Sequence, residues 1–253
     1  MLCCGIDVRR GYLSEIFASF QGEGAHLGRR HLFVRLAGCN LRCRYCDTPD
    51  SLERRPEFVL VRDANSSERH ANPVSASGAA ALVQTILAGD RYVDAVAVTG
   101  GEPLVQSEFL SELLQRGKFG VPVLLETAGV LARRLPDVLP WVDIVSMDIK
   151  LPSNTGERQF WDEHALFLEH ARAKALYVKV LVDDASADED VERAASLVAV
   201  GAPSAPVFVQ PISDPTGYPS ISPRRLTELF LLVRRHVGDV RVVPQTHKVL
   251  GIQ

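Results

Sequence analysis

The strongest constraint on this chain is a cysteine-rich stretch, residues 39–46 (CNLRCRYC), whose three thiols follow the spacing C-x3-C-x2-C. Thiolates are suited to zinc, copper(I) and iron–sulfur clusters. A closed zinc site and an ordinary cubane cluster each need four protein ligands, yet no cysteine follows Cys46. The spacing therefore predicts a metal centre with one position open to a ligand that is not protein, which is typical of a reactive site.

Composition narrows the class of protein. The 253 residues are 46% apolar and 23% charged, as in a soluble globular chain with a substantial core. The net charge of −3 provides no general attraction to nucleic acid or to an anionic membrane. No apolar run approaches the roughly 20 residues that span a bilayer, and the first ten residues lack a signal-peptide core. Cys3 and Cys4 are adjacent and suggest no disulfide framework, so we expect a cytoplasmic protein without nucleic-acid or membrane partners.

Strand and helix patterns alternate along the chain, which predicts parallel strands joined by right-handed crossovers in a single α/β domain, residues 1–253. The expected strands are 12–20, 31–36, 95–98, 121–125, 142–145, 176–182, 207–209 and 240–243. The expected helices are 77–87, 105–116, 130–139, 157–173, 188–200 and 223–237. Residues 50–75 are polar and contain prolines around a short β-like stretch, which predicts an insertion or a lid.

Polar segments stand where several of these strands end. They are Thr99-Gly100-Gly101-Glu102-Pro103, Glu126-Thr127, Ser146-Met147-Asp148 and Gln210-Pro211. The cysteine stretch likewise follows strand 31–36. Because ligands bind at the C-terminal ends of strands in parallel sheets and barrels, we expect one site at this edge. The paired glycines allow backbone to come close to a ligand without a Cβ clash.

The cysteine spacing resembles the signature of radical S-adenosylmethionine (SAM) enzymes. The resemblance implies a partial, modified (β/α) barrel in which Cys39, Cys43 and Cys46 hold a [4Fe–4S] cluster and SAM occupies the open iron. Gly-Gly-Glu-Pro after a strand resembles the segment that binds the SAM amino group. The SAM-binding candidates are Tyr45, Asp47, Gly100, Gly101, Glu102, Glu126, Ser146, Met147, Asp148 and Gln210. Relatives often have Ser-Pro-Lys where this chain has Ser-Met-Asp, and ordinary strand-end capping is the alternative role for the later strand-end residues.

The flanks of the cysteine stretch resemble one family, 7-carboxy-7-deazaguanine synthase. The resemblance rests on residues 20–24 (FQGEG), Arg35, residues 37–39 (AGC), residues 46–49 (CDTP) and the tail 244–248 (PQTHK). That family converts 6-carboxy-5,6,7,8-tetrahydropterin by ring contraction and loss of ammonia, in queuosine-type deazapurine biosynthesis. It implies Mg²⁺ near the cluster, bound by Thr48, and substrate contacts in a tail, 244–253, that enters the active site.

Substrate contacts are implied for Phe20, Gln21, Gly22, Glu23, Arg35, Thr99, His247 and the terminal Gln253. The chemistry agrees, because carboxylate and backbone acceptors read amide and amino edges. Arg35 offers a bidentate fork to a carboxylate, and a threonine oxygen suits Mg²⁺. Three simpler roles stay open: Arg35 pairs with a core carboxylate, Thr48 caps the next turn, and His247 closes the barrel.

Two other functions remain as alternatives. A glycyl-radical activase shares the cysteine spacing, but residues 21–24 and the tail are then unexplained. A non-catalytic zinc-binding module would bind zinc and a partner protein through the same thiols. The family resemblance implies an electron donor such as flavodoxin or ferredoxin, and a homodimer.

Overall fold

Strands and helices alternate along most of residues 9–63 and 66–252, which this computed structural model describes. The strands are β1 (Arg10–Gly11), β2 (Leu13–Phe20), β3 (Arg30–Leu36), β4 (Glu57–Asp63), β5 (Ser66–Ala71), β6 (Val74–Ser75), β7 (Ala95–Gly100), β8 (Val123–Thr127), β9 (Ile144–Ile149), β10 (Ala175–Val182), β11 (Val207–Pro211) and β12 (Val240–Val242). The α-helices are α1 (Ala76–Gly89), α2 (Ser107–Gly117), α3 (Leu135–Val138), α4 (Pro152–Thr155), α5 (Trp161–Ala171), α6 (Asp188–Gly201), α7 (Pro223–Arg234) and α8 (Thr246–Leu250). Cys3, Cys4 and Gln253 lie outside the described residues.

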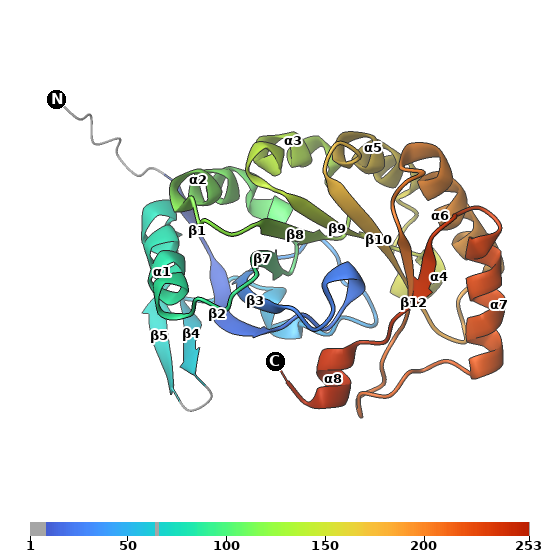
Figure 1. Cartoon of the computed structure of the whole chain (residues 1–253), viewed down its shortest axis with the longest axis horizontal. Coiled ribbons are helices and arrows are strands. Elements are labelled where there is room, and N and C mark those ends of the chain that lie inside the picture. The colour runs from blue at the N-terminus through green and yellow to red at the C-terminus, as the bar shows by residue number, and fades with distance from the viewer. Residues whose placement is uncertain (1–8, 64–65, 253) are drawn as a thin grey trace.

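A curved sheet of ten strands forms the centre of the molecule, in the order β12-β11-β10-β9-β8-β7-β3-β2-β4-β5 (Figure 1). Its neighbouring strands are parallel except in the pairs β2–β3 and β4–β5. Within the described residues the sheet does not close, because β12 and β5 are its two edges. The prediction of a partial (β/α) barrel with mostly parallel strands is therefore confirmed.

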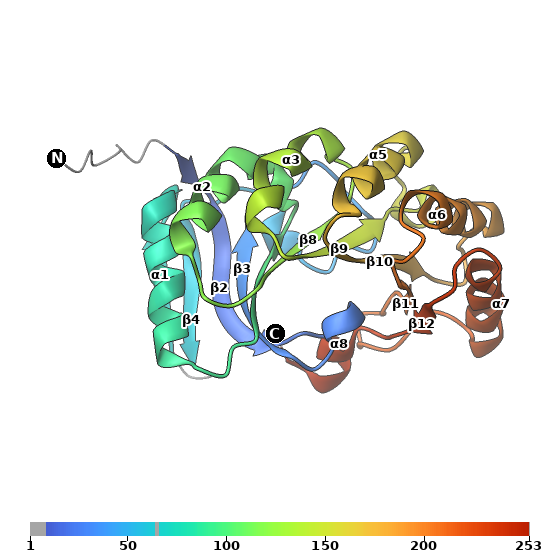
Figure 2. The ribbon, with the colours of Figure 1, turned by 45° about the horizontal axis from the view of Figure 1, so that its top comes forward.

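The larger helices cover the convex face of the sheet, whereas the short C-terminal helix α8 lies on the concave side (Figures 1 and 2). The apolar side chains of the strands alternate between the two faces. In β7, Val96 and Val98 belong to the main core cluster, while Ala97 belongs to a second cluster of different composition. No helix of the described residues is long and apolar enough to cross a membrane.

The second cluster forms an apolar layer on the other face of these strands. Its buried members are Phe17, Phe33, Ala97, Leu124, Tyr177 and Phe208. Two positions further along the same strands, a polar layer follows, with Arg35, Thr99, Glu126, Lys179 and Gln210. Because side chains of a strand repeat their direction every two residues, this order places polar groups immediately beyond the apolar layer. The polar layer is where the candidate site is found.

Several predicted elements differ in extent or in role. Strands β4 and β5, within the predicted insertion or lid of 50–75, extend the edge of the sheet, with Phe58 and Leu60 buried in the main core. A role of 50–75 as an insertion or a lid stays a prediction. The helix predicted over 157–173 begins only at Trp161, because Gly156 ends the short helix α4 in a left-handed conformation. Strand β9 continues to Ile149, so Ser146-Met147-Asp148 lies within the strand and not after it.

Candidate active site

A cavity of about 460 Å³ brings together most of the predicted site residues. Seventeen of them line it: Phe20, Gln21, Gly22, Glu23, Arg35, Cys39, Cys43, Tyr45, Cys46, Asp47, Thr48, Thr99, Gly100, Gly101, Glu126, Asp148 and His247. Glu102, Ser146, Met147 and Gln210 are buried but do not line it, and Gln253 lies outside the described residues. Contacts between the cavity-lining residues and their assigned ligands stay predictions.

Residues 20–23 reach this cavity from an unexpected direction. Strand β2 is antiparallel to β3, so its last residue, Phe20, pairs with Arg30 at the start of β3. The following loop turns back, and the side-chain amide of Gln21 donates to Glu126 Oε1 over 2.7 Å. The site therefore combines one edge of the sheet with a loop that enters from the other end.

The cysteine loop is held by backbone contacts on both sides. Gly38 N and Cys39 N donate to the carbonyls of Ser51 and Leu52, over 2.7 and 3.2 Å. On the other side, the Arg44 guanidinium donates to the carbonyls of Ser153 and Asn154. These contacts order the loop without using its thiols, since Cys39, Cys43 and Cys46 are free and half-buried. The thiols thus remain available to a metal centre.

The paired glycines are required by this loop. A Cβ atom on Gly100 would lie 2.1 Å from Leu36 O, and Gly100 has a φ of +128°. A Cβ atom on Gly101 would lie 2.5 Å from Gly38 O and 2.7 Å from Ser51 O. Both glycines also line the cavity. Their first role is thus to let β7 end directly against the backbone that carries the cysteines.

We expect Gly101→Ala to destabilise the fold, because the new methyl group meets backbone oxygens that cannot move away without opening the cysteine loop. The expected loss is about 1–3 kcal/mol of unfolding free energy, as for other overpacking substitutions. Urea unfolding followed by circular dichroism measures it. Gly89→Ala is the matched control, because a Cβ atom there meets nothing within 4 Å. An equal, small effect of both substitutions would contradict the close approach.

The thiols fit a cluster better than a compact zinc site. Tetrahedral zinc with bonds of about 2.3 Å holds its sulfur ligands about 3.8 Å apart. Among the described residues, the cysteine sulfurs are not one of the groups of three or more ligand atoms that lie within 4.8 Å of one another. Burial raises the pKa of Cys39 to about 11 and also raises the pKa of Cys43, so both thiols hold protons until a metal displaces them.

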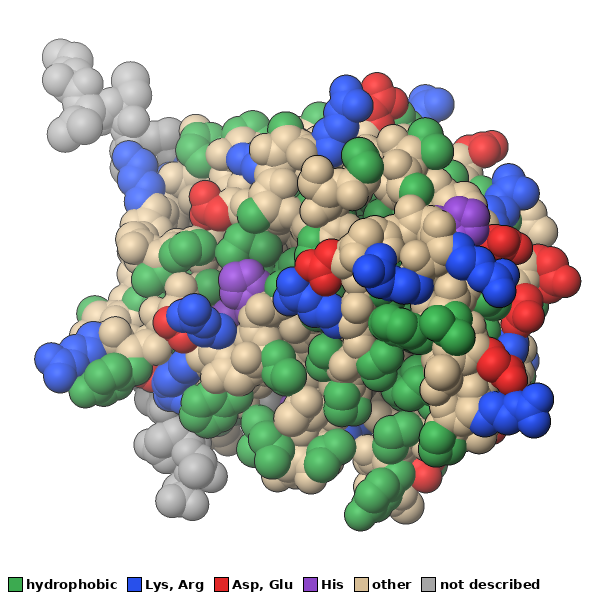
Figure 3. Space-filling view, turned by 45° about the vertical axis from the view of Figure 1, so that its right-hand side comes forward, with side chains coloured by type: hydrophobic (Ala, Val, Ile, Leu, Met, Phe, Trp, Pro, Cys, Tyr) green, Lys and Arg blue, Asp and Glu red, His purple; other side chains and the backbone are tan. Residues whose placement is uncertain are grey.

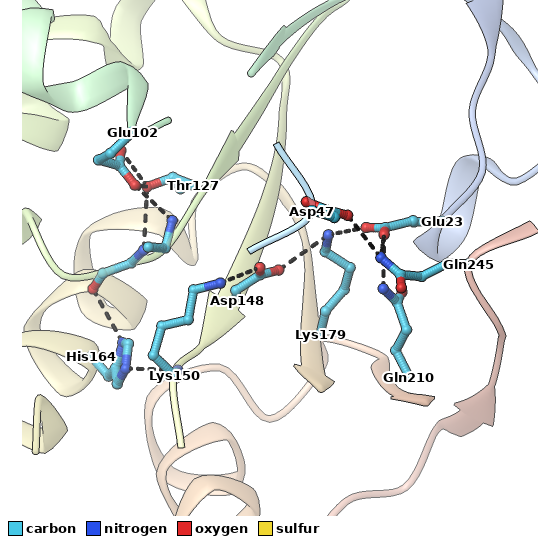
Figure 4. A network of polar contacts seen from close by, with 12 residues as sticks. Glu23, Asp47, Glu102, Thr127, Asp148, Lys150, His164, Lys179, Gln210 and Gln245 are labelled. Atoms are coloured by element: carbon cyan, nitrogen blue, oxygen red, sulfur yellow. Dashed lines mark hydrogen bonds and ion pairs between the residues drawn. The ribbon is translucent and has the colours of Figure 1, made fainter. Parts of the chain in front are cut away.

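A chain of alternating charges runs across the floor of the cavity (Figure 4). Lys179 forms ion pairs with Glu23 and, over 3.1 Å, with Asp148. Asp148 also pairs with Lys150 over 2.8 Å, and the Lys150 ammonium lies 5.5 Å from the centre of the Tyr45 ring. Because every charge has an opposite neighbour, this buried chain connects residues 20–23 to the cysteine loop without an isolated charge.

Opposing effects set the protonation states of Glu23 and Lys179 in this row of charges. Burial alone raises the pKa of Glu23, but the charge and hydrogen bond of Lys179, with smaller effects of His247 and Gln245, lower it from 4.5 to about 2. Burial likewise opposes the charge of Lys179, yet Asp148 and Glu23 hold its pKa well above the ordinary value. Glu23 is therefore ionised at neutral pH and can only accept hydrogen bonds.

The depressed pKa of Glu23 predicts a particular acid sensitivity. Its contribution to stability is complete above pH 4.5 and is lost as the pH falls through about 2, amounting to about 3 kcal/mol. Glu23→Gln lacks this titrating group. We expect the difference in unfolding free energy between the two proteins to change between pH 5 and pH 2, measured by urea titration. A pH-independent difference would show that Glu23 is not ion-paired.

Two of the predicted residues outside the cavity, Glu102 and Gln210, have identifiable hydrogen-bond partners. Glu102 accepts hydrogen bonds from Leu104 N, Thr127 Oγ1 and Ala128 N, so it joins the ends of β7 and β8. Gln210 donates to Glu23 Oε1 over 2.8 Å from beneath. The Met147 side chain belongs to the main core and faces away from the cavity. These three side chains support the site from outside the cavity, a role that the prediction of SAM contacts did not include.

Arg35 and Thr48 bear on two of the open alternatives. Arg35 Nε donates to Glu15 over 2.6 Å, yet the guanidinium still lines the cavity. Thr48 stands at the N-cap position of the short helix Pro49–Ser51, but its side chain makes no capping hydrogen bond. The hydroxyl of Thr48 is thus not used by the local turn, which fits an oxygen donor set for Mg²⁺ beside Asp47.

The C-terminal tail is anchored to both sides of the cavity. Thr246 N donates to Gly22 O over 3.0 Å, and the Gln245 amide donates to Glu23 and to Asp47. His247 lies directly over Gly22, where a Cβ atom would be 2.2 Å from His247 Nδ1. The tail therefore forms one wall of the cavity, and its entry into an active site stays a prediction. Ligand atoms of Glu23, Asp47 and His247 lie within 4.8 Å of one another, and Glu23 already accepts from Lys179, Gln210 and Gln245, which leaves about one of its four acceptor positions for a ligand.

Sequence reasoning missed Glu15, Lys150, Lys179 and Gln245. One signal was present: Lys179 is the only charged residue in the apolar run 175–182 (ALYVKVLV), and a lysine there is buried only if it is paired. Lys150 stands two positions after Asp148, and side chains repeat their direction every two residues along a strand. Glu15 and Gln245 carried no such signal, because their roles depend on contacts between distant segments.

A partial (β/α) barrel with three free thiols on a loop after β3, facing a cavity at the strand ends, defines the class of radical SAM proteins. Residues 34–182 match the family described as the radical SAM superfamily. The chain is 38% identical to the 7-carboxy-7-deazaguanine synthase of Geobacter sulfurreducens, over 94% of this chain and 96% of that protein. It is 37% identical to the synthase of Methanopyrus kandleri, over 93% and 92%. The crystal structure of QueE from Escherichia coli, 22% identical, has a similar fold with a TM-score of 0.61 over 94% of this chain and 95% of that one.

The chain belongs to the 7-carboxy-7-deazaguanine synthase family of radical SAM enzymes. The predicted family, fold and class of enzyme are thereby confirmed. Neither the glycyl-radical activase nor the zinc-binding module is favoured by these relatives.

Proposed function

We propose that this enzyme converts 6-carboxy-5,6,7,8-tetrahydropterin to 7-carboxy-7-deazaguanine with loss of ammonia, in deazapurine biosynthesis. The observation that carries the proposal is the shared cavity. It joins the cysteine loop and the Gly-Gly strand end to residues 20–23, Arg35 and the C-terminal tail. The first two segments are predicted to bind cluster and SAM, and the other three to bind the pterin. Their union supports one reaction that uses both ligands.

The cysteine loop is built to hold a cluster with an open iron. Cys39, Cys43 and Cys46 would be its ligands, and Gly100, Gly101 and Tyr45 would face SAM. When bound, the cluster and SAM together supply a radical that removes a hydrogen atom from the substrate. Leu41 N already donates to Cys39 Sγ over 3.4 Å. Such a hydrogen bond stabilises a thiolate, so the loop is prepared for the ligated state.

The other end of the cavity presents groups that suit a carboxylated pterin. Glu23, ionised and held by Lys179, Gln210 and Gln245, accepts from the amide and amine groups of the pterin ring. Arg35 offers its two terminal nitrogens to the substrate carboxylate, because only Nε is used by Glu15 among the described contacts. Thr99 lines the same cavity and directly precedes Gly100 in the predicted SAM segment.

A magnesium ion would suit the region between these two ends. The hydroxyl of Thr48 and the carboxylate of Asp47 are hard oxygen donors at the cavity wall. We assign the predicted Mg²⁺ to Thr48, with water and substrate oxygens completing its coordination. A homodimer, a cytoplasmic location and an external one-electron donor complete the proposal.

Anaerobic incubation of the reconstituted enzyme with SAM, a reductant, Mg²⁺ and 6-carboxy-5,6,7,8-tetrahydropterin tests the function. Mass spectrometry should detect 7-carboxy-7-deazaguanine in amounts that grow with enzyme and time. The same reaction without pterin should yield only products of SAM cleavage. Cleavage of SAM without any deazaguanine from the pterin would leave the radical SAM class intact and overturn the substrate assignment.

A further inference from the structure

A second concave surface lies behind the cysteine loop, outside the cavity described above. It has a volume of about 710 Å³ and is lined by four arginines, Arg133, Arg134, Arg158 and Arg193, with Trp161 among its other residues. We call this surface the arginine groove. Nothing in the proposed reaction uses it. We propose that a small acidic one-electron carrier protein docks in the arginine groove and reduces the cluster from there. The inference rests on the proposed function, which requires an external electron donor.

The position of the groove is the first reason to expect docking there. A small apolar cluster of Leu41, Ala128, Val130 and Phe160 lies next to the cysteine loop, and Cys39 and Cys43 pack against it. Val130 also lines the groove. The groove and the two thiols therefore border the same small apolar cluster. A protein seated in the groove would come close to the metal centre without entering the substrate cavity.

Direct contacts tie the groove to the cysteine loop. Arg158 stacks on Phe160, with its guanidinium carbon 4.2 Å from the ring centre. The neighbouring Glu157 accepts a hydrogen bond from Arg42 N over 2.5 Å. Gly156 packs beside the side chain of Arg44. Residues 156–160 thus form a continuous connection from the groove to the loop that carries the thiols.

The positive charge of the groove is the second reason to expect docking there. Arg133, Arg134 and Arg193 make no ion pair with a described carboxylate, and Arg158 pairs with Glu163. On the adjoining loop, Arg42 and Arg44 are exposed, and their guanidinium groups donate only to backbone carbonyls. The groove and the adjoining loop therefore carry six arginines and three carboxylates, Glu157, Asp162 and Glu163. This surface is positive although the whole chain has a net charge of −3. Basic and acidic side chains are intermixed on the face shown in Figure 3.

An acidic protein fits this surface better than other anionic partners. Arginine is favoured in protein interfaces and pairs well with carboxylates, which an acidic carrier presents in number. Electrostatic complementarity mainly accelerates and orients association, which suits a carrier that binds briefly and leaves after one electron. The exchange balances: the carrier is oxidised by one electron and the cluster is reduced by one.

The test measures binding separately from turnover. The probe is a [2Fe–2S] ferredoxin of strongly negative net charge, titrated in its oxidised form into the reconstituted enzyme and into the cluster-free chain, with calorimetry as the readout. We expect Arg133→Glu/Arg158→Glu to weaken binding at least about tenfold in both forms. Arg91→Glu/Arg235→Glu, the same charge change at exposed positions elsewhere, should change it less than about twofold. Raising the salt from 50 to 500 mM should weaken wild-type binding strongly.

A second measurement separates this inference from the proposed function. Product formation driven by dithionite, which needs no docking surface, should be equal in wild type and in the groove variant. Product formation driven by reduced ferredoxin should fall at least about tenfold in the groove variant only. Arg133→Gln/Arg158→Gln should give an intermediate loss. Equal ferredoxin affinity of groove and control variants would overturn the docking site, as would preferential binding of single-stranded RNA. Loss of dithionite-driven product in wild type would instead reject the proposed function.

Discussion

Replacing Cys39, Cys43 or Cys46 with alanine should abolish formation of the deazaguanine product in each case. Three thiolates are the smallest set that can hold a cubane with one open iron, and no other cysteine lies among the described residues. Losing one ligand should therefore cost more than the roughly 10–100-fold effect of losing an outer hydrogen-bond partner. We expect turnover below detection, a loss of iron per chain, and a weaker absorption band near about 400 nm after reconstitution.

The cysteine variants should still fold. The loop is held by the backbone N–H groups of Gly38 and Cys39 and by the Arg44 guanidinium, and none of these contacts involves a sulfur atom. Circular dichroism and thermal melting of the cluster-free proteins check this point. Asn40→Ala is the matched control, because Asn40 is exposed in the same loop and is not a thiol; its turnover should stay within about twofold of wild type. Cleavage of SAM by any of the three cysteine variants would refute the assignment of the cluster ligands.

Lys179→Met should give the largest loss of stability. The ammonium group is buried between Glu23 and Asp148, so its removal leaves two carboxylates facing each other across the cavity floor. Breaking a buried pair in this way costs about 3–5 kcal/mol of unfolding free energy. Turnover should also fall, because Glu23 loses the cation that keeps it ionised. Urea unfolding and steady-state assays at neutral pH measure the two effects.

A double-mutant cycle with Glu23→Gln gives this prediction its control. In the double variant, Glu23→Gln/Lys179→Met, both charges are absent, and Asp148 keeps its partner Lys150. We expect the double variant to be more stable than the sum of the two single effects predicts, by about 0.5–3 kcal/mol. Additive effects would show that Lys179 and Glu23 do not depend on each other. Exposed Lys118→Ala should leave stability nearly unchanged.

The polar residues at the strand ends show how far pattern reasoning reaches. The alternation of strands and helices predicted a mostly parallel sheet, and parallel sheets bring strand ends to one edge. Thr99, Glu126 and Asp148 do meet there, in one cavity. Gln210 belongs to the same group in sequence, yet it is fully buried beneath Glu23. A pattern predicts the edge that a residue occupies, but it does not predict which neighbour lies above it.

The loop 20–24 shows the complementary case. Its sequence resembled a substrate-binding segment, although its strand β2 runs antiparallel to β3 and ends beside the start of β3. Only the turn after Phe20, which brings Gln21 to Glu126, places the loop in the cavity. The region 50–75 shows a related limit. Its polar residues suggested an insertion or a lid, and the pattern did not predict that β4 and β5 extend the edge of the sheet, with Phe58 and Leu60 buried.

By itself, the sequence determined the chemistry of the metal loop, the family and the α/β class. These depend on local spacing: three thiols within eight residues, two glycines after a strand, and the alternation of elements. The tertiary structure alone decided which charges are neutralised and which surfaces are concave. Lys179 is 156 residues from Glu23, and Gln245 is 198 residues from Asp47. Such pairs produce no periodic pattern in the sequence. The distance between their side chains is set by the curvature of the whole sheet and by the C-terminal tail that closes over it.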